Sequence, residues 1–123
     1  MLEPMTIITN NPLTRDFISK QNDCELCYMP VTYREVLLFA RDAVHEGRRL
    51  LTHPLSGSIK PGETPYKSLA LSKEAGNLDV DSLELIENCI LTCDKFPLKH
   101  QGLSQKCLMD FQVVDLTLIQ SIF

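Results

Sequence analysis

A chain of 123 residues, with 44% hydrophobic and 23% charged side chains, has the composition of one globular domain, expected to cover residues 1–123. Its net charge of −4 and its scattered lysines and arginines argue against nucleic-acid binding, which needs a basic stripe. No apolar run approaches the roughly 20 residues of a membrane span, and the start MLEPMTIITNNP lacks the features of a signal peptide, so we expect a cytoplasmic protein that does not contact a membrane.

The first elements along the chain predict a strand, a helix and a second strand. Met5–Thr9 is a β-branched apolar run of strand length. Asn11 and Pro12 are typical of a helix cap and a first helical position, which predicts a short helix to about Gln21. Residues 24–30 predict the second strand, which the proline at its end stops.

The clearest predicted element is a helix over residues 32–46. Thr32 and Glu35 have the spacing of a capping box, and Gly47 stands where a left-handed residue ends many helices. Because apolar residues recur at helical spacing, we expect one face to be buried. That face consists of Tyr33, Val36, Leu37, Ala40 and Val44.

The next segments predict two strands and a second long helix. Residues 48–52 and 66–72 read as strands three and four. Asp81 and Glu84 form the expected cap of a helix that ends at Pro97. The apolar face of this helix consists of Leu83, Ile86, Cys89, Ile90 and Cys93.

The C-terminal part predicts a loop over 97–107, a last strand over 108–115 and a terminal helix over 116–123, with Leu116, Ile119 and Phe123 facing inward. Alternation of strands and helices favours an α/β fold. We therefore expect a single three-layer domain, with a mostly parallel sheet of about five strands and helices on both faces.

The sequences IITNNPL and LLTHPL repeat one local pattern at the ends of the first and third predicted strands. If these two strands run parallel, both repeats lie at the carboxyl edge of the sheet. This edge is where open α/β sheets bind ligands.

The segment from Thr52 to Ser68, THPLSGSIKPGETPYKS, is a long loop between apolar segments. Loops of this length in compact domains are usually functional or disordered, and three prolines stiffen it. Successive backbone N–H groups can form an anion-binding nest. A phosphate or carboxylate site here would use Ser56, Gly57, Ser58, Lys60 and Lys67. The alternative is a rigid connection with solvated lysines.

His53 stands where the third predicted strand ends, as an acid or base, a ligand contact, or a histidine hydrogen-bonded into the loop. The cysteines predict no metal site. Cys24 and Cys27 would point to opposite faces of a strand, while Cys89 and Cys93 share an apolar helical face and are expected to be structural. We expect neither a metal nor another cofactor.

Three stretches of the sequence resemble one known family. The run ITNNP and the block RDAVHEGRRLLTHPLSGSIKPGETPYKSLALSK, followed by LDVDSLELIENCI, are similar to the GrdX family. Its members are small proteins encoded beside the glycine reductase components of anaerobic bacteria that ferment amino acids. The resemblance covers most of the chain. Arg48 stands where the family's pattern has a histidine, and the pair Cys24 and Cys27 lies outside the resemblance.

The resemblance implies a cytoplasmic accessory role near glycine, sarcosine or betaine reductase, with a reductase component or a small anion as the partner. It assigns no catalytic residue. The motif positions that it implies as a shared binding surface are Asn10, Asn11, His53, Ser56, Gly57, Ser58, Lys60, Tyr66 and Lys67. The alternative is a small enzyme acting on a phosphate or carboxylate substrate, with His53 as acid or base.

Overall fold

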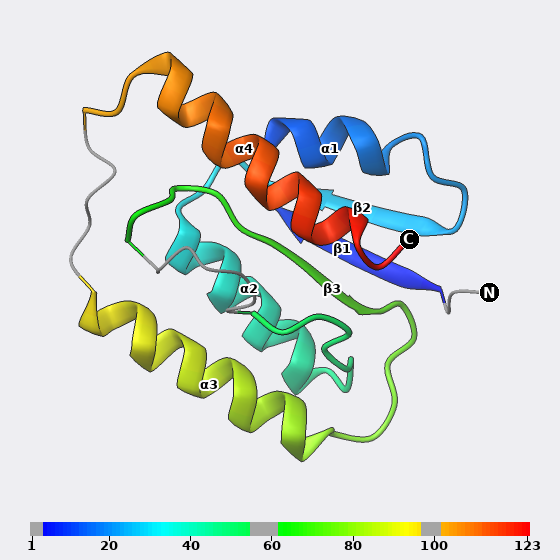
Figure 1. The fold of residues 1–123 in the computed structure, drawn as a ribbon. Helices are drawn as coiled ribbons and strands as arrows, with labels where there is room; N and C mark the ends of the chain where they lie inside the picture. The colour runs from blue at the N-terminus through cyan, green and yellow to red at the C-terminus, as the bar shows by residue number, and fades with distance from the viewer. Residues whose placement is uncertain (1–3, 55–61, 97–101) are drawn as a thin grey trace.

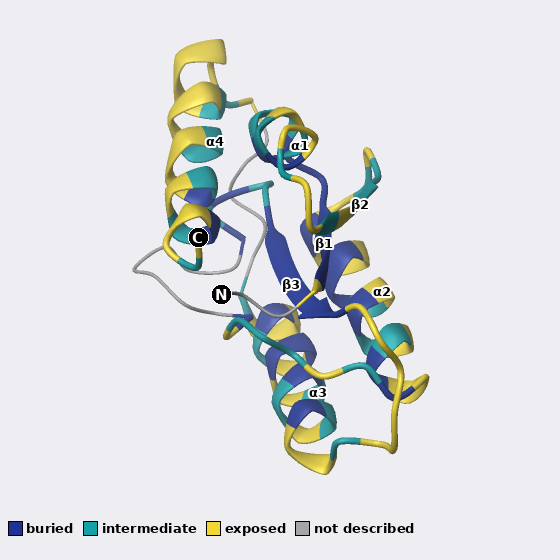
Figure 2. Cartoon of the chain, turned by 90° about the vertical axis from the view of Figure 1, so that its right-hand side faces the viewer, coloured by how far each residue is buried: buried dark blue, intermediate teal, exposed yellow. Residues whose placement is uncertain are grey.

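The computed structural model describes residues 4–54, 62–96 and 102–123, in which a three-stranded sheet lies between two pairs of helices (Figure 1). Helices α1 and α4 cover one face of the sheet, and α2 and α3 cover the other (Figures 1 and 2). The elements in chain order are β1 (Met5–Thr9), α1 (Pro12–Ile18), β2 (Cys24–Tyr28), α2 (Tyr33–His45), β3 (Ser68–Ser72), α3 (Val80–Lys95) and α4 (Gln105–Gln120).

The sheet has the order β2-β1-β3 and is mixed. β1 runs parallel to β2, with Thr9 opposite Tyr28, and antiparallel to β3, with Thr9 opposite Ser68. The fold is therefore α/β in general, but the expected sheet of about five mostly parallel strands is wrong. Two of the predicted strands do not form, and β3 runs against its neighbour.

Residues 48–52 do not form a regular strand. They run antiparallel to β3 and make one isolated bridge, between Leu50 and Leu71. Side chains take up backbone groups that a full ladder would pair: the Arg49 N–H donates to Ser72 Oγ, and the Ala70 N–H donates to Thr52 Oγ1. Because side chains replace ladder bonds, the segment follows the edge of β3 without extending the sheet as a strand.

Residues 108–115 belong to α4, so the predicted last strand is also wrong. Ser104 caps this helix by accepting a hydrogen bond from the Cys107 N–H. Val113 and Val114 are β-branched, a residue type enriched in strands, but both lie exposed on the helix surface. The predicted terminal helix is the last part of this longer element.

The predictions for residues 5–47 are confirmed with small shifts of boundary. Asn11 caps α1, which ends at Ile18. Thr32 and Glu35 form both bonds of the capping box of α2. Gly47 follows α2 with a φ of 103°, in the left-handed region that favours glycine.

The cap of α3 differs from the prediction. Asp79, and not Asp81, accepts the hydrogen bond from the Ser82 N–H, so that α3 begins at Val80. Both residues are aspartates two positions apart, and the sequence pattern favoured the one with a glutamate three residues later.

Two apolar clusters lie on the two faces of the sheet, as the alternation of side chains along a strand requires. In Figure 2 the strands β1 and β3 are buried, and the outer side of α4 is exposed. Cys27 packs against the α2 and α3 cluster, whereas Cys24 packs against the other, so these two thiols lie on opposite faces as predicted. The first cluster has the buried residues Ile8, Tyr33, Val36, Leu37, Ala40, Val44, Leu69, Leu71, Ile86, Ile90 and Cys93, and the second has Met5, Ile7, Ile18, Ala70 and Ile119.

Candidate functional site

Buried polar side chains gather at the end of the sheet where β1 finishes. Thr9, Asn10 and Asn11 follow one another there, and all three are almost fully enclosed. Ser68 begins β3 opposite Thr9, and the two hydroxyl oxygens lie 2.7 Å apart. Buried polar groups are retained only when they are hydrogen-bonded, so each of these side chains needs a partner at this end.

Asp115 of α4 is the acceptor at the centre of this cluster. Its Oδ2 accepts hydrogen bonds from Asn11 Nδ2 at 2.9 Å, from Thr14 Oγ1 at 3.3 Å and from Ser68 Oγ at 2.5 Å. The residue is 7% exposed. A single buried carboxylate oxygen therefore joins α1, β3 and α4, and charge-assisted bonds of this kind are stronger than neutral ones.

Asn10 fixes the end of the 52–68 loop. Its Nδ2 donates to the carbonyl oxygens of Val31 at 2.9 Å and Pro65 at 2.8 Å, and its Oδ1 accepts from the Lys67 N–H at 2.8 Å. Both the amide nitrogen and the amide oxygen of Asn10 are thus hydrogen-bonded to the backbone. It positions the backbone of Lys67 beside the end of β1.

Lys67 is a charged residue that is buried at this end of the sheet. It is only 6% exposed, and its ammonium lies 5.7 Å from the centre of the Tyr33 ring, within cation–π range. Within residues 4–54, 62–96 and 102–123, this ammonium has no hydrogen bond and no ion pair. Burial lowers the pKa of Lys67 below its ordinary value, although the nearby Asp115 carboxylate acts in the opposite direction.

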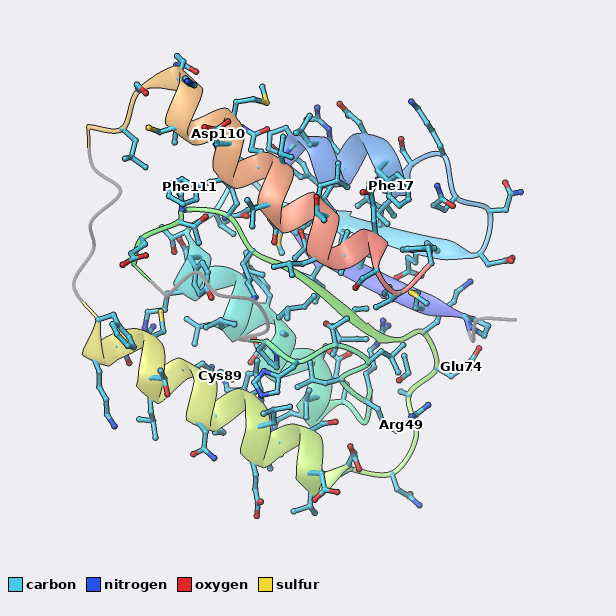
Figure 3. The ribbon with its side chains drawn as sticks, in the orientation of Figure 1. Phe17, Arg49, Glu74, Cys89, Asp110 and Phe111 are labelled. Atoms are coloured by element: carbon cyan, nitrogen blue, oxygen red, sulfur yellow. The ribbon has the colours of Figure 1, made fainter. Side chains whose placement is uncertain are left out.

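A small open cavity lies beside Lys67, between the start of β3 and α4. Its volume is about 20 Å³, enough for one water-sized group. Phe111 extends from α4 toward the segment that enters β3 (Figure 3) and forms part of the wall. The lining residues are Tyr33, Thr64, Tyr66, Lys67, Phe111, Val114, Asp115 and Leu118.

Tyr66 closes the side of this cavity toward α4. Its hydroxyl oxygen accepts a hydrogen bond from Gln112 Nε2 at 2.9 Å, and its backbone N–H donates to Thr64 Oγ1 at 3.2 Å. Because this oxygen acts as an acceptor in that bond, the Tyr66 hydroxyl can still donate its own hydrogen. Tyr66 also lines the cavity. The cavity therefore combines a buried cation, a carboxylate and a hydroxyl with apolar side chains.

The structure brings together four of the residues expected in the binding surface: Asn10, Asn11, Tyr66 and Lys67. The side chains of Asn10 and Asn11 are engaged by protein groups, so they position the site. Lys67 keeps an unpaired charge among the described residues. The predicted residues Ser56, Gly57, Ser58 and Lys60 lie outside the described residues.

His53 is exposed and does not line this cavity. The segment before it pairs with β3 on the edge opposite β1. Because β3 is antiparallel to both β1 and residues 49–52, the ends at Thr9 and Thr52 point toward the same end of the sheet. β3 lies between them, so His53 is separated from Asn10 by a strand.

Sequence reasoning missed Asp115 and two of the residues that donate to it, Thr14 and Ser68, and it treated Tyr33 only as core. A signal was present: Asp115 and Ile119 are four residues apart and share a face if residues 105–120 form a helix. Both are buried in α4. Assigning residues 108–115 to a strand concealed that shared face.

All five cysteines are free thiols. Cys89 lies on the side of α3 that faces α2 (Figure 3) and is 2% exposed. Burial raises the pKa of both Cys89 and Cys93, which disfavours their thiolate forms. Among the described residues no cluster of three His, Cys, Asp or Glu side chains is arranged to hold a metal ion.

A comparison with family models decides the relationship of this chain to known proteins. The model of the GrdX-like proteins matches residues 6–123, which is nearly the whole chain. The chain belongs to the GrdX-like protein family. The family resemblance inferred from the sequence is therefore confirmed. No curated protein matches this member of the family, and no solved structure does.

The described part of this GrdX-like protein contains no helix that is both long enough and apolar enough to cross a membrane. Its longest helices, α3 and α4, have 16 residues each. A hydrocarbon core needs roughly 20 apolar residues in helical form, and α4 carries a buried aspartate in its middle.

Proposed function

We propose that this GrdX-like protein is a cytoplasmic accessory protein of the glycine, sarcosine or betaine reductase system. It would bind a reductase component or a small anionic ligand through the segment from Thr52 to Ser68. Family membership supports the reductase context. One observation supports the anion: Lys67 is only 6% exposed, and its ammonium has no hydrogen bond or ion pair among the described residues.

The cost of burying that ammonium is the reason to expect a ligand. An unpaired buried charge is unfavourable, and proteins usually pair such charges or neutralise them. The Tyr33 ring offers partial compensation at 5.7 Å, since a cation–π contact contributes about 0.5–2 kcal/mol. A carboxylate or phosphoryl oxygen in the cavity would supply the missing charge-assisted hydrogen bond.

The described residues favour binding over catalysis at His53. That side chain is exposed, and it does not line the cavity beside Lys67. A general base must reach the proton it abstracts within hydrogen-bond distance, directly or through one water. Lys67 and not His53 is therefore the group on which the proposed function depends.

Anion binding is tested by exchanging chloride for acetate or phosphate at constant ionic strength while backbone amide resonances are recorded. We expect the largest shifts at Asn10, Tyr66 and Lys67. Lys67→Met keeps most of the apolar stem, removes the charge and should abolish those shifts. Lys73→Met, at an exposed lysine just after β3, is the matched control and should leave them unchanged. Equal shifts in wild type and Lys67→Met would contradict the proposal.

The reductase context is tested separately, with purified components of glycine, sarcosine or betaine reductase passed over immobilised protein. Retention of one component by wild type, and weaker retention by Lys67→Met than by Lys73→Met, is the expected result. Failure of every component to bind, with and without acetate or phosphate, would remove the accessory role while leaving the anion site standing.

A further inference from the structure

Lys67 and Asp115 line the same cavity without forming an ion pair. No N–O distance of 4.0 Å or less joins them, although ion pairs of that length occur elsewhere among the described residues, as between Arg34 and Asp94 at 2.7 Å. Oppositely charged groups that share a buried space normally pair unless something holds them apart. Here the backbone of Lys67 is held by Asn10, and Asp115 is held by its hydrogen bonds.

The two charged groups still have unused hydrogen-bonding capacity toward the cavity. Asp115 uses Oδ2 for all three of its hydrogen bonds, while Oδ1 accepts none among the described residues. In the same part of the chain, the one side-chain atom that is fully enclosed without a partner is Arg48 Nε. Asp115 Oδ1 and Lys67 Nζ therefore both retain some accessible surface.

The charge of this cavity is balanced. Among the residues that the structure describes, its wall has one cation, Lys67, and one anion, Asp115, and the other lining residues are neutral. A dianion would gain from Lys67 and be repelled by Asp115, and a simple cation would face the reverse. A ligand that carries one negative and one positive group satisfies both side chains at once.

We propose that the ligand of this site is a small zwitterion, with a carboxylate that binds the Lys67 ammonium and an ammonium that binds Asp115 Oδ1. This inference rests on the proposed function, because it names the ligand class of the same site. Phe111, Val114 and Leu118 place apolar surface beside both charges, and charge interactions next to such surface are stronger than in bulk water.

The size of the cavity sets the length of the ligand. A volume of about 20 Å³ holds one water-sized group, so only one end of a ligand enters the cavity and the rest lies at its open mouth. Because Lys67 and Asp115 line this same small cavity, a ligand that reaches both has its two charged groups close together. The ligand is therefore compact, with few atoms between its carboxylate and its ammonium, as in α- and β-amino acids without a large side chain.

The test compares ligands of the same shape that differ in one charged group. Glycine and propionate have equal numbers of heavy atoms, as do β-alanine and butyrate, and propylamine carries the positive group alone. Binding is measured from the amide shifts of Lys67 and Tyr66 at constant ionic strength. We expect the better zwitterion to bind at least about tenfold more tightly than its matched carboxylate, which is the value of one good hydrogen bond, and propylamine not to bind.

Asp115→Asn separates the two charges of the site. Asparagine keeps an oxygen to accept the three hydrogen bonds and replaces Oδ1 by an amide nitrogen. The variant should lose the preference for the zwitterion and still bind the matched carboxylate. Asp110→Asn, at an exposed position of α4, is the control. Thermal unfolding of each variant shows whether it is folded under the conditions used.

The ligand series, measured on wild type and on Lys67→Met, separates the zwitterion from the anion site. Equal affinity for zwitterion and matched carboxylate, both lost in Lys67→Met, would overturn the zwitterion and leave the anion site standing. Binding of propylamine alone would also overturn it. Binding of none of these ligands, or binding that Lys67→Met leaves intact, would contradict the proposed function as well.

Discussion

Ser68 at the start of β3 donates a hydrogen bond of 2.5 Å to Asp115 of α4, and the two residues are 47 positions apart in the chain. Thr9 lies opposite Ser68 in the sheet, so the bond connects the C-terminal helix to the end of the central strand. Lys67 is the neighbour of Ser68 in sequence. The contact that attaches α4 therefore also fixes one wall of the candidate site.

Asp115→Ala should destabilise the protein strongly. The change leaves the donors of Asn11, Thr14 and Ser68 without their shared acceptor inside the protein, and an unsatisfied buried group costs about 1–3 kcal/mol. We expect a loss of about 3 kcal/mol or more in the free energy of unfolding, measured in urea. Asp110→Ala, on the exposed side of the same helix, should change it by less than about 0.5 kcal/mol. Equal effects of the two changes would mean that the network contributes nothing.

Lys67→Met should change how stability depends on pH. Burial lowers the pKa of Lys67 in the folded protein, while an unfolded chain has a lysine pKa of about 10.4. Between these two values the unfolded state binds more protons, so the stability of wild type rises with pH. The variant lacks this rise. The difference between the two proteins should therefore move in favour of wild type as pH approaches about 10.

Urea unfolding of both proteins between about pH 6 and about pH 10 measures this difference. Lys73→Met, at an exposed lysine, should follow the wild-type curve throughout. A constant difference between wild type and Lys67→Met over the whole range would show that the lysine pKa is the same in both states.

Leu37→Ala tests the packing of α2. Leu37 is 0% exposed in the cluster between α2, α3 and the sheet, and truncating a buried leucine costs about 2–5 kcal/mol. Phe39, two residues away, is 44% exposed, so Phe39→Ala should lose clearly less. Calorimetric or urea unfolding of the two variants ranks them. The opposite ranking would mean that the helix buries its other face.

Gly47→Ala should be far more damaging than Gly102→Ala. Both glycines have positive φ, of 103° and 75°, which costs an alanine about 1 kcal/mol or more. A Cβ at Gly47 would in addition lie 2.0 Å from the carbonyl oxygen of Gly76, whereas a Cβ at Gly102 meets nothing within 4 Å. The midpoint of thermal unfolding should fall for both and fall much further for Gly47→Ala. Similar midpoints would contradict the close approach of residues 47 and 76.

The parts of the fold that sequence reasoning predicted correctly are those with local signals. Caps, apolar periodicity and a terminal glycine lie within a few residues of one another, and they located α1 and α2. The wrong predictions concern segments whose structure depends on residues far away in the sequence. Residues 48–52 keep the backbone bonds of only one bridge to β3, because the side chains of Ser72 and Thr52 accept two N–H groups that a longer ladder would pair. β3 pairs antiparallel with β1, and no signal within either segment gives that direction.

The candidate site was predictable only in part for the same reason. Lys67 and Asn10 were found from the loop and the motif, but their pairing partners come from other elements. Asp115 lies 48 residues beyond Lys67 in the numbering of the chain, and its segment was predicted to be a strand, whereas it forms part of α4. Because residues 105–120 form a helix, Asp115 and Ile119 are buried on the same face of α4. Asp115 therefore lines the cavity beside Lys67.

The measurement that tests the central claim most directly is the pKa of Lys67 itself, followed through the chemical shift of its side-chain ¹³Cε as acetate replaces chloride. An anion that binds the charged form favours protonation, so the account predicts that the pKa of Lys67 rises as acetate is added, by about one unit for each tenfold preference. The ¹³Cε shifts of exposed lysines such as Lys73 should not respond. A pKa of Lys67 that stays constant up to high acetate concentrations would contradict the claim that this buried ammonium binds an anionic ligand.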